Sequence, residues 1–105
     1  MNIRSIGVVG SGQMGNGISQ VAACSGFNVT MVDINEQFLE RGISAIRNSL
    51  GRLVSKEKMS QDDADSAISL ITSSTALDSL AECDLVVEAI PEVPELKFST
   101  FRDLD

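Results

Sequence analysis

Three glycines near the N-terminus have the spacing of a phosphate-binding turn. Gly10, Gly12 and Gly15 stand in the run GSGQMG, which fits the pattern GxGxxG. In that pattern the first glycine permits a tight turn, the second lets the backbone approach a pyrophosphate, and the third lets a helix pack closely on a strand. The free N–H groups at the start of that helix would face the phosphates. We therefore expect a dinucleotide to bind at Gly10, Ser11, Gly12, Gln13, Met14 and Gly15.

An acidic residue follows the turn at the distance that such a site requires. Asp33 comes 18 residues after Gly15, close to the roughly 20 residues found in dinucleotide sites. Its carboxylate would accept hydrogen bonds from the adenosine ribose and repel a 2′-phosphate. Neither Ile34 nor Asn35 offers a compensating cation. The sequence therefore favours NAD over NADP, with a purely structural glycine turn and a capping aspartate as the alternatives.

The turn needs a strand before it and a helix after it, and the flanking sequence predicts both. Residues 6–9 are a short apolar run, typical of a strand buried on both faces. Residues 13–25 predict a helix that ends at Gly26. A second strand, rich in β-branched residues, is expected over 28–33 and ends at Asp33. The apolar stripe of the helix is expected at Met14, Ile18, Val21 and Ala22.

Strands and helices continue to alternate along the rest of the chain. Asn35 is expected to cap a long helix, and Ser60 with Asp63 resembles a capping box that begins another. The long helix would bury Leu39, Ile43, Ile46, Leu50 and Leu53. Further elements are expected as a strand over 68–72, a helical turn over 75–82, a strand over 84–90, and a last helix from Pro94 that carries Phe98, Phe101 and Leu104.

This alternation predicts a parallel sheet with right-handed crossovers. The fold class is therefore α/β, a doubly wound Rossmann-type sheet with flanking helices and the expected strand order 3-2-1-4. Residues 1–105 would form one NAD-binding domain, truncated before the later strands of the fold. The strand over 84–90 would then be a bare apolar edge, so we expect the chain to self-associate as a homo-oligomer.

Composition excludes several classes of function. The chain has 105 residues, 8 Lys and Arg against 15 Asp and Glu, a net charge of −7 and no histidine. Nucleic acid and anionic membrane surfaces are therefore not expected partners, and neither histidine catalysis nor a metal site is expected. Cys24 and Cys83 are expected as buried thiols. With no signal peptide or membrane span in the sequence, we expect a cytoplasmic protein.

Beyond the turn, the sequence resembles a known enzyme family. The run VVGSGQMGNGISQVAACSGFNVTMVDIN, the later VVEAIPE and the closing LKFSTFRDLD are similar to the N-terminal half of the L-3-hydroxyacyl-CoA dehydrogenases, including bacterial 3-hydroxybutyryl-CoA dehydrogenases. The continuation of the glycine motif through Gly17, Ile18 and Gln20 carries much of this resemblance. The long helical segment over 35–67 also fits this family.

The resemblance implies reversible hydride transfer between NAD and the 3-hydroxyl carbon of an acyl-CoA substrate. It assigns Ala89, Glu92 and Lys97 to the nicotinamide side of NAD, and Ser49 and Lys56 to the phosphates of coenzyme A. The histidine base of the family, with its partners, would lie beyond residue 105, so no residue of this chain is expected to be catalytic. The alternatives are a non-catalytic nucleotide-binding module and an NAD-dependent dehydrogenase of a sibling family.

Overall fold

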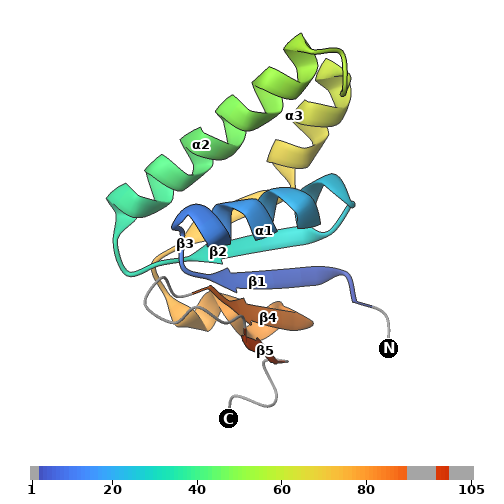
Figure 1. Ribbon diagram of the computed structural model, residues 1–105. Helices are drawn as coiled ribbons and strands as arrows, with labels where there is room; N and C mark the ends of the chain where they lie inside the picture. The colour runs from blue at the N-terminus through green and yellow to red at the C-terminus, as the bar shows by residue number, and fades with distance from the viewer. Residues whose placement is uncertain (1–2, 90–96, 100–105) are drawn as a thin grey trace.

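A five-stranded sheet lies at the centre of the residues that the structure describes, which are 3–89 and, for the backbone, 97–99 (Figure 1). In this computed structural model the strand order is β3-β2-β1-β4-β5. The strands are β1 (Ser5–Val9), β2 (Asn28–Val32), β3 (Ile71–Ser74), β4 (Leu85–Glu88) and β5 (Lys97–Ser99). The first four pair in parallel, as the predicted order 3-2-1-4 requires, and β5 pairs antiparallel with β4.

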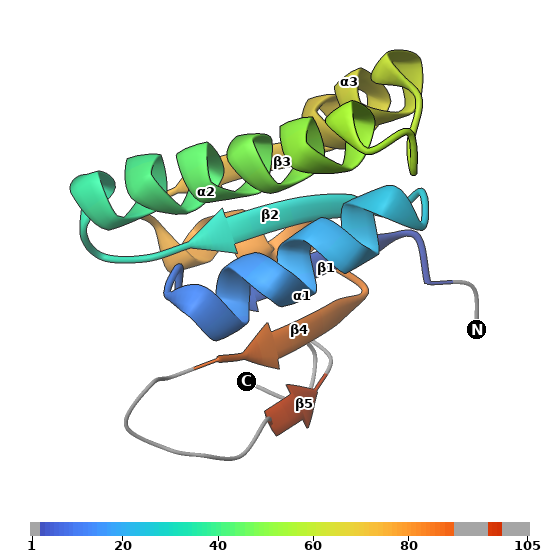
Figure 2. The ribbon, with the colours of Figure 1, turned by 45° about the horizontal axis from the view of Figure 1, so that its top comes forward.

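Helices cover the two faces of the sheet unequally. They are α1 (Gln13–Cys24), α2 (Glu36–Ser55), α3 (Gln61–Ser69) and the short 3₁₀ helix η1 (Leu77–Glu82). The three α-helices pack on one another on one side of the sheet, and α1 and α2 lie side by side in Figure 2. Leu80 of η1 packs on the opposite face. This arrangement is the doubly wound α/β fold that the sequence predicts.

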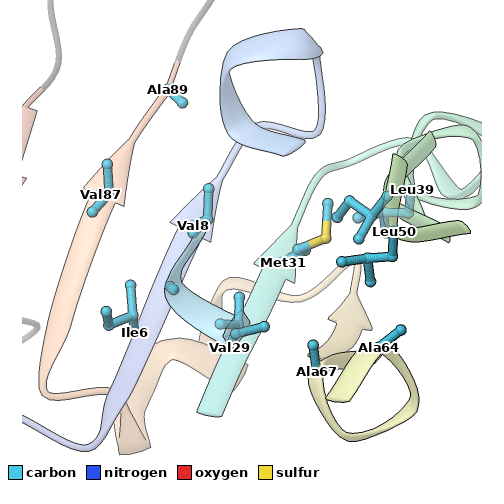
Figure 3. Packing of buried hydrophobic residues seen from close by; sticks show 13 residues of the cluster. Ile6, Val8, Val29, Met31, Leu39, Leu50, Ala64, Ala67, Val87 and Ala89 are labelled. Atoms are coloured by element: carbon cyan, nitrogen blue, oxygen red, sulfur yellow. The ribbon is translucent and has the colours of Figure 1, made fainter. Parts of the chain in front are cut away.

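The core divides between the two faces because successive strand residues point in opposite directions. Val8 and Met31, both fully buried, point toward the helices (Figure 3). Val32 and Val86 pack with Leu80 and Cys83 on the other side. Buried residues of the helix layer are Leu39, Ile46 and Leu50 of α2 with Ala64 and Ala67 of α3. Both faces of β1, β2 and β4 are therefore largely buried, as the continuous apolar runs of these strands predict.

Two side chains cap the starts of helices, and one glycine follows the end of a helix, where the sequence predicts. The Asn35 side chain accepts hydrogen bonds from the backbone nitrogens of Gln37 and Phe38 at the start of α2. The Ser60 hydroxyl accepts one from the nitrogen of Asp63 at the start of α3. Gly26 follows α1 with a φ of 94°, a conformation that favours glycine. These three local predictions are confirmed.

The predicted apolar stripe of α1 is confirmed at Ala22 and, in part, at Ile18, but it is wrong at Met14 and Val21. Met14 is 38% exposed and Val21 is 68% exposed. Small residues form the buried face instead, namely Gly15, Ser19, Ala22 and Ala23. Small side chains let α1 approach the sheet closely, whereas Met14, Ile18 and Val21 line an apolar groove between α1 and β4. Apolar periodicity alone did not separate these two neighbouring faces.

Two predicted elements near the C-terminus also need correction. The third strand occupies Ile71–Ser74 rather than 68–72, because its pairing with β2 starts at Ile71 and residues 68 and 69 complete α3. Residues 97–99 form β5 and not part of a helix, since they pair with Val86–Glu88. The edge of β4 is therefore covered, and the expected self-association through a bare β4 loses its premise. Pro94, Phe101 and Leu104 lie outside the described residues.

The two cysteines differ in exposure. Cys83 is buried as expected, and burial raises the pKa of its thiol, but Cys24 at the end of α1 is exposed. Both are free thiols. None of the described helices combines the length and the apolar character needed to cross a membrane.

A carboxylate joins the starts of β1 and β4. Oδ2 of Asp84 accepts hydrogen bonds from the backbone nitrogens of Arg4 and Ser5, at 2.8 and 3.1 Å. The hydroxyl of Ser5 in turn accepts one from the nitrogen of Asp84, at 3.1 Å. The N–H of Arg4, and then that of Ser5, hold the pKa of Asp84 below its ordinary value of 3.8. The Asp84 carboxylate thus links the starts of β1 and β4, and the strength of this link depends on its being ionised.

This geometry predicts a pH dependence of stability. Because the folded-state pKa is depressed, the ionised Asp84 stabilises the fold at pH values above its unfolded-state pKa, and this contribution disappears as the pH falls through the folded-state pKa. Asp84→Asn should therefore lower the free energy of unfolding at pH 7, and the difference from wild type should shrink below pH 3.8. Urea unfolding over this pH range measures it, with Asp78→Asn at an exposed carboxylate as control. A difference that stays constant with pH would contradict the prediction.

Candidate functional site

The glycine turn joins the carboxyl ends of β1, β2 and β4. The nitrogen of Gly10 donates a hydrogen bond to the carbonyl of Val32 at 2.8 Å, and the nitrogen of Ala89 donates to the carbonyl of Val9 at 2.9 Å. Gly10 has a φ of 105°, and a Cβ built on it would come within 2.3 Å of the Ala89 carbonyl oxygen. Only glycine suits this position. Ala89 therefore lies beside the turn, at the sheet edge where open α/β folds bind ligands.

The third glycine of the motif allows α1 to start directly on the turn. A Cβ at Gly15 would lie 1.9 Å from the carbonyl oxygen of Gly10. Gly12 is the N-cap residue and supplies no side-chain hydrogen bond, and the first turn of α1 contains no acidic residue. By contrast, α2 and α3 both have side-chain caps. The N–H groups at the start of α1 are therefore left for an anionic ligand such as a pyrophosphate.

Asp33 follows β2 and is tied to the turn. Its Oδ2 accepts hydrogen bonds from the hydroxyl of Ser11 at 2.9 Å and from the nitrogen of Ser11 at 3.2 Å. Its Oδ1 accepts one from the nitrogen of Asn35 at 3.2 Å. Partial burial pushes the pKa of Asp33 upward, but these hydrogen bonds outweigh it and hold the pKa below the ordinary value. The carboxylate is therefore ionised at neutral pH and able to accept from a ribose hydroxyl.

A cavity of about 630 Å³ opens between the turn and α2, within the range of small-molecule sites. Its lining combines the turn with residues that the sequence did not single out, of which Phe38 is 48% exposed. The Arg41 guanidinium lies 5.9 Å from the centre of the Phe38 ring. The lining residues are Gly10, Ser11, Gly12, Gln13, Asn16, Asp33, Ile34, Phe38, Arg41, Gly42 and Ala45. The cavity thus has an apolar wall, an anion and a cation.

Gly42 positions α2 against the turn, and sequence analysis missed it. A Cβ there would come within 2.5 Å of Oδ1 of Asn16 and 3.1 Å of the carbonyl oxygen of Ser11. A glycine inside a long amphipathic helix weakens that helix, so its presence there indicates a position where close packing excludes a side chain. That signal, together with the position of Phe38 and Arg41 in the first two turns after Asp33, could have identified this wall of the site.

The structure does not bring all the predicted site residues together. Met14 faces the apolar groove described above and not the cavity. Ser49, half-buried, and Lys56, exposed, belong to the far part of α2 and its C-cap. Ser49 is about 20 Å along the helix from its start, at 1.5 Å per residue. Lys97 pairs with Glu88 in the register of β4 and β5, and Glu92 lies outside the described residues.

Comparisons with known proteins agree on one family. The family described as 3-hydroxyacyl-CoA dehydrogenase, NAD binding domain, matches residues 5–105. A 3-hydroxybutyryl-CoA dehydrogenase of Bradyrhizobium diazoefficiens is 42% identical over 102 residues, which are 97% of this chain and 35% of that protein. The chain therefore spans about a third of the length of the curated relatives it matches.

Solved structures of the same group share the fold. The (S)-3-hydroxybutyryl-CoA dehydrogenase of Ralstonia eutropha is 44% identical with a TM-score of 0.85, over 88% of this chain and 32% of that one. The protein FadB2 of Mycobacterium tuberculosis is 40% identical with a TM-score of 0.86, over 89% and 33%.

Two glycines of the same helix give a matched test of the turn. Gly15→Ala should lower the free energy of unfolding by about 2 kcal/mol or more, because the added methyl group meets the Gly10 carbonyl and α1 must move. Gly17→Ala meets nothing within 4 Å and should raise stability by about 0.5–1 kcal/mol. Chemical denaturation of both variants measures the difference. Equal effects of the two substitutions would show that the close approach at Gly15 is not needed.

Proposed function

Since this chain belongs to the family of 3-hydroxyacyl-CoA dehydrogenase NAD-binding domains, we propose that it is the NAD-binding part of an enzyme that interconverts (S)-3-hydroxyacyl-CoA and 3-oxoacyl-CoA. The observation that carries the proposal is the meeting of an uncapped helix start and an ionised Asp33 in one cavity. Gly10 and Gly15, where a Cβ would meet a backbone carbonyl oxygen, let α1 start at the sheet edge with its N–H groups open to the pyrophosphate of NAD. This proposal is favoured over a non-catalytic nucleotide-binding module.

The residues of this chain act by binding and orienting the cofactor. NAD, when bound, supplies the hydride acceptor of the reaction. The N–H groups at the start of α1 hold the pyrophosphate. The carboxylate of Asp33 accepts from the adenosine ribose and disfavours a 2′-phosphate. Ala89, beside the turn, would face the nicotinamide ribose, with Glu92 and Lys97 contacting the nicotinamide half.

The catalytic base must come from elsewhere in the enzyme. The chain contains no histidine, and we propose that the base belongs to the part of the relatives that this chain does not match. A 105-residue chain without that part would bind NAD and remain inactive toward acyl-CoA.

The second half of α2 is proposed to contact the acyl-CoA substrate. Lys56 ends the helix as its exposed C-cap residue, and Ser49 lies two turns earlier. An ammonium group that is free to move in solvent suits a phosphate of coenzyme A. Their distance from Asp33 along α2 separates the substrate carrier from the adenosine end of NAD.

Location and assembly are proposed for the whole protein. We propose that the whole protein is a cytoplasmic homo-oligomer. We also propose that it binds neither nucleic acid nor membranes, and the net charge of −7 supports this second point alone. The names of some relatives state another cellular compartment, as for a peroxisomal multifunctional protein of Arabidopsis thaliana.

Calorimetric titration tests the cofactor site directly. Wild type should bind NAD and prefer it over NADP. Asp33→Asn should weaken NAD binding by about 1–3 kcal/mol, because the hydrogen bond from the ribose loses its charged acceptor, and weaken NADP binding less because the repelling charge is gone. A thermal melt of the variant controls for folding. No NAD binding by wild type, or equal affinity for the two cofactors, would overturn the proposal.

Two lysines near the end of α2 offer a matched test of the substrate contact. Lys56→Gln should weaken the binding of coenzyme A by about 1 kcal/mol, roughly 5-fold, through loss of a charged hydrogen bond. Lys58→Gln, two residues along and equally exposed, removes the same charge as a control. NMR titration with coenzyme A measures both. Equal losses in the two variants would reduce the contact to general electrostatic attraction.

A further inference from the structure

The carboxylate of Asp33 has little freedom left in this structure. A carboxylate offers about four lone-pair directions, two on each oxygen. The hydroxyl and the backbone nitrogen of Ser11 take those of Oδ2, at 2.9 and 3.2 Å. The nitrogen of Asn35 takes one of Oδ1, at 3.2 Å. The backbone N–H of Ile34 also acts on this carboxyl, so at most one direction on Oδ1 is left for a ribose hydroxyl.

Ser11 is itself held firmly, so it can fix its partner. Its exposed fraction is 4%, and its carbonyl oxygen faces α2 at Gly42, where an added Cβ would stand 3.1 Å away. Its position lies between the first two glycines of the motif, which requires no particular side chain there. The hydroxyl is therefore an addition to the motif, and its donated hydrogen bond joins the glycine turn to the end of β2.

We propose that Ser11 is a positioning residue that sets the cofactor specificity of this site through Asp33. Its hydroxyl fixes the orientation of the carboxylate, so that one oxygen faces the ribose and a 2′-phosphate meets a charge that cannot turn away. Without the hydroxyl, the carboxylate gains rotational freedom and accommodates the phosphate more readily. This inference rests on the proposed function, because it assumes that NAD binds at Asp33.

The ionisation of Asp33 supports the same assignment. Burial raises the pKa of the carboxyl, and among the hydrogen bonds that lower this pKa the one from the Ser11 hydroxyl has the largest effect. Removing the hydroxyl therefore weakens the hold on the charged form. The effect on ionisation is a property of the free protein and can be measured without any cofactor.

The first experiment follows the Asp33 carboxyl by NMR in the 105-residue chain. In Ser11→Ala the pKa of Asp33 should rise, and in Ser11→Thr, which keeps the hydroxyl, it should return toward wild type. Ser25→Ala, which removes a hydroxyl bonded to the Val21 carbonyl at the other end of α1, should leave it unchanged. An unchanged pKa in Ser11→Ala would overturn the proposal.

The second experiment is a double-mutant cycle on cofactor binding by calorimetry. Ser11→Ala should weaken NAD binding about 3- to 10-fold, the size of one hydrogen bond, and lower the preference for NAD over NADP. In the Asp33→Ala background, which has no acceptor for the Ser11 hydroxyl, the same substitution should change NAD affinity less than about 2-fold. Equal losses in both backgrounds would show that Ser11 does not act through Asp33.

The two levels of failure remain distinguishable. If wild type does not bind NAD, the proposed function fails, and the specificity role of Ser11 fails with it. If wild type binds NAD but Ser11→Ala keeps full affinity and preference, the function stands and only the role of Ser11 is overturned. The Thr variant is included only if its thermal melt matches wild type, and the cycle with Asp33→Ala decides the question without it.

Discussion

The site depends on one close approach of backbone to backbone. Where β1, β4 and α1 meet, a Cβ on Gly10 or Gly15 would overlap a carbonyl oxygen by more than an ångström, at 2.3 and 1.9 Å. Because neither glycine has a Cβ, α1 can begin at the sheet edge with its first N–H groups uncapped. Because a helix start attracts anions, a chain with a net charge of −7 can still hold a pyrophosphate there. The missing side chains at Gly10 and Gly15 thus allow the close packing that gives the site its attraction for anions.

In the proposed function, Asp33 extends this turn into a site that distinguishes NAD from NADP. It lies beyond β2, yet Ser11 binds it from the turn and Asn35 from the start of α2. The carboxylate is consequently held and ionised at the place proposed for the ribose. Gly42 performs the matching task for α2, bringing the wall formed by Phe38 and Arg41 up to the turn. The groups proposed to bind the phosphates and the ribose therefore belong to one packed unit.

Local signals predicted most of this fold because they act over a few residues. The glycine spacing, the caps at Asn35 and Ser60 and the turn at Gly26 are all confirmed, and the family match agrees with the resemblance read from the motif. The parallel strand order 3-2-1-4 is also confirmed, but two other predictions that depended on a distant partner failed. The exposure of Val21 depends on which face of α1 meets the sheet, and residues 97–99 are a strand because β4 offers them hydrogen bonds.

The sequence by itself determined the parallel α/β fold, the glycine turn and the pairing of that turn with Asp33, because each is written in spacing and residue type. Only the tertiary structure decided which atoms meet. The hydrogen bond from Ser11 to Asp33 spans 22 residues, and the wall at Phe38 and Arg41 exists because Gly42 lets α2 approach. Such contacts depend on how two elements pack, and packing is a property of the whole core rather than of any local segment.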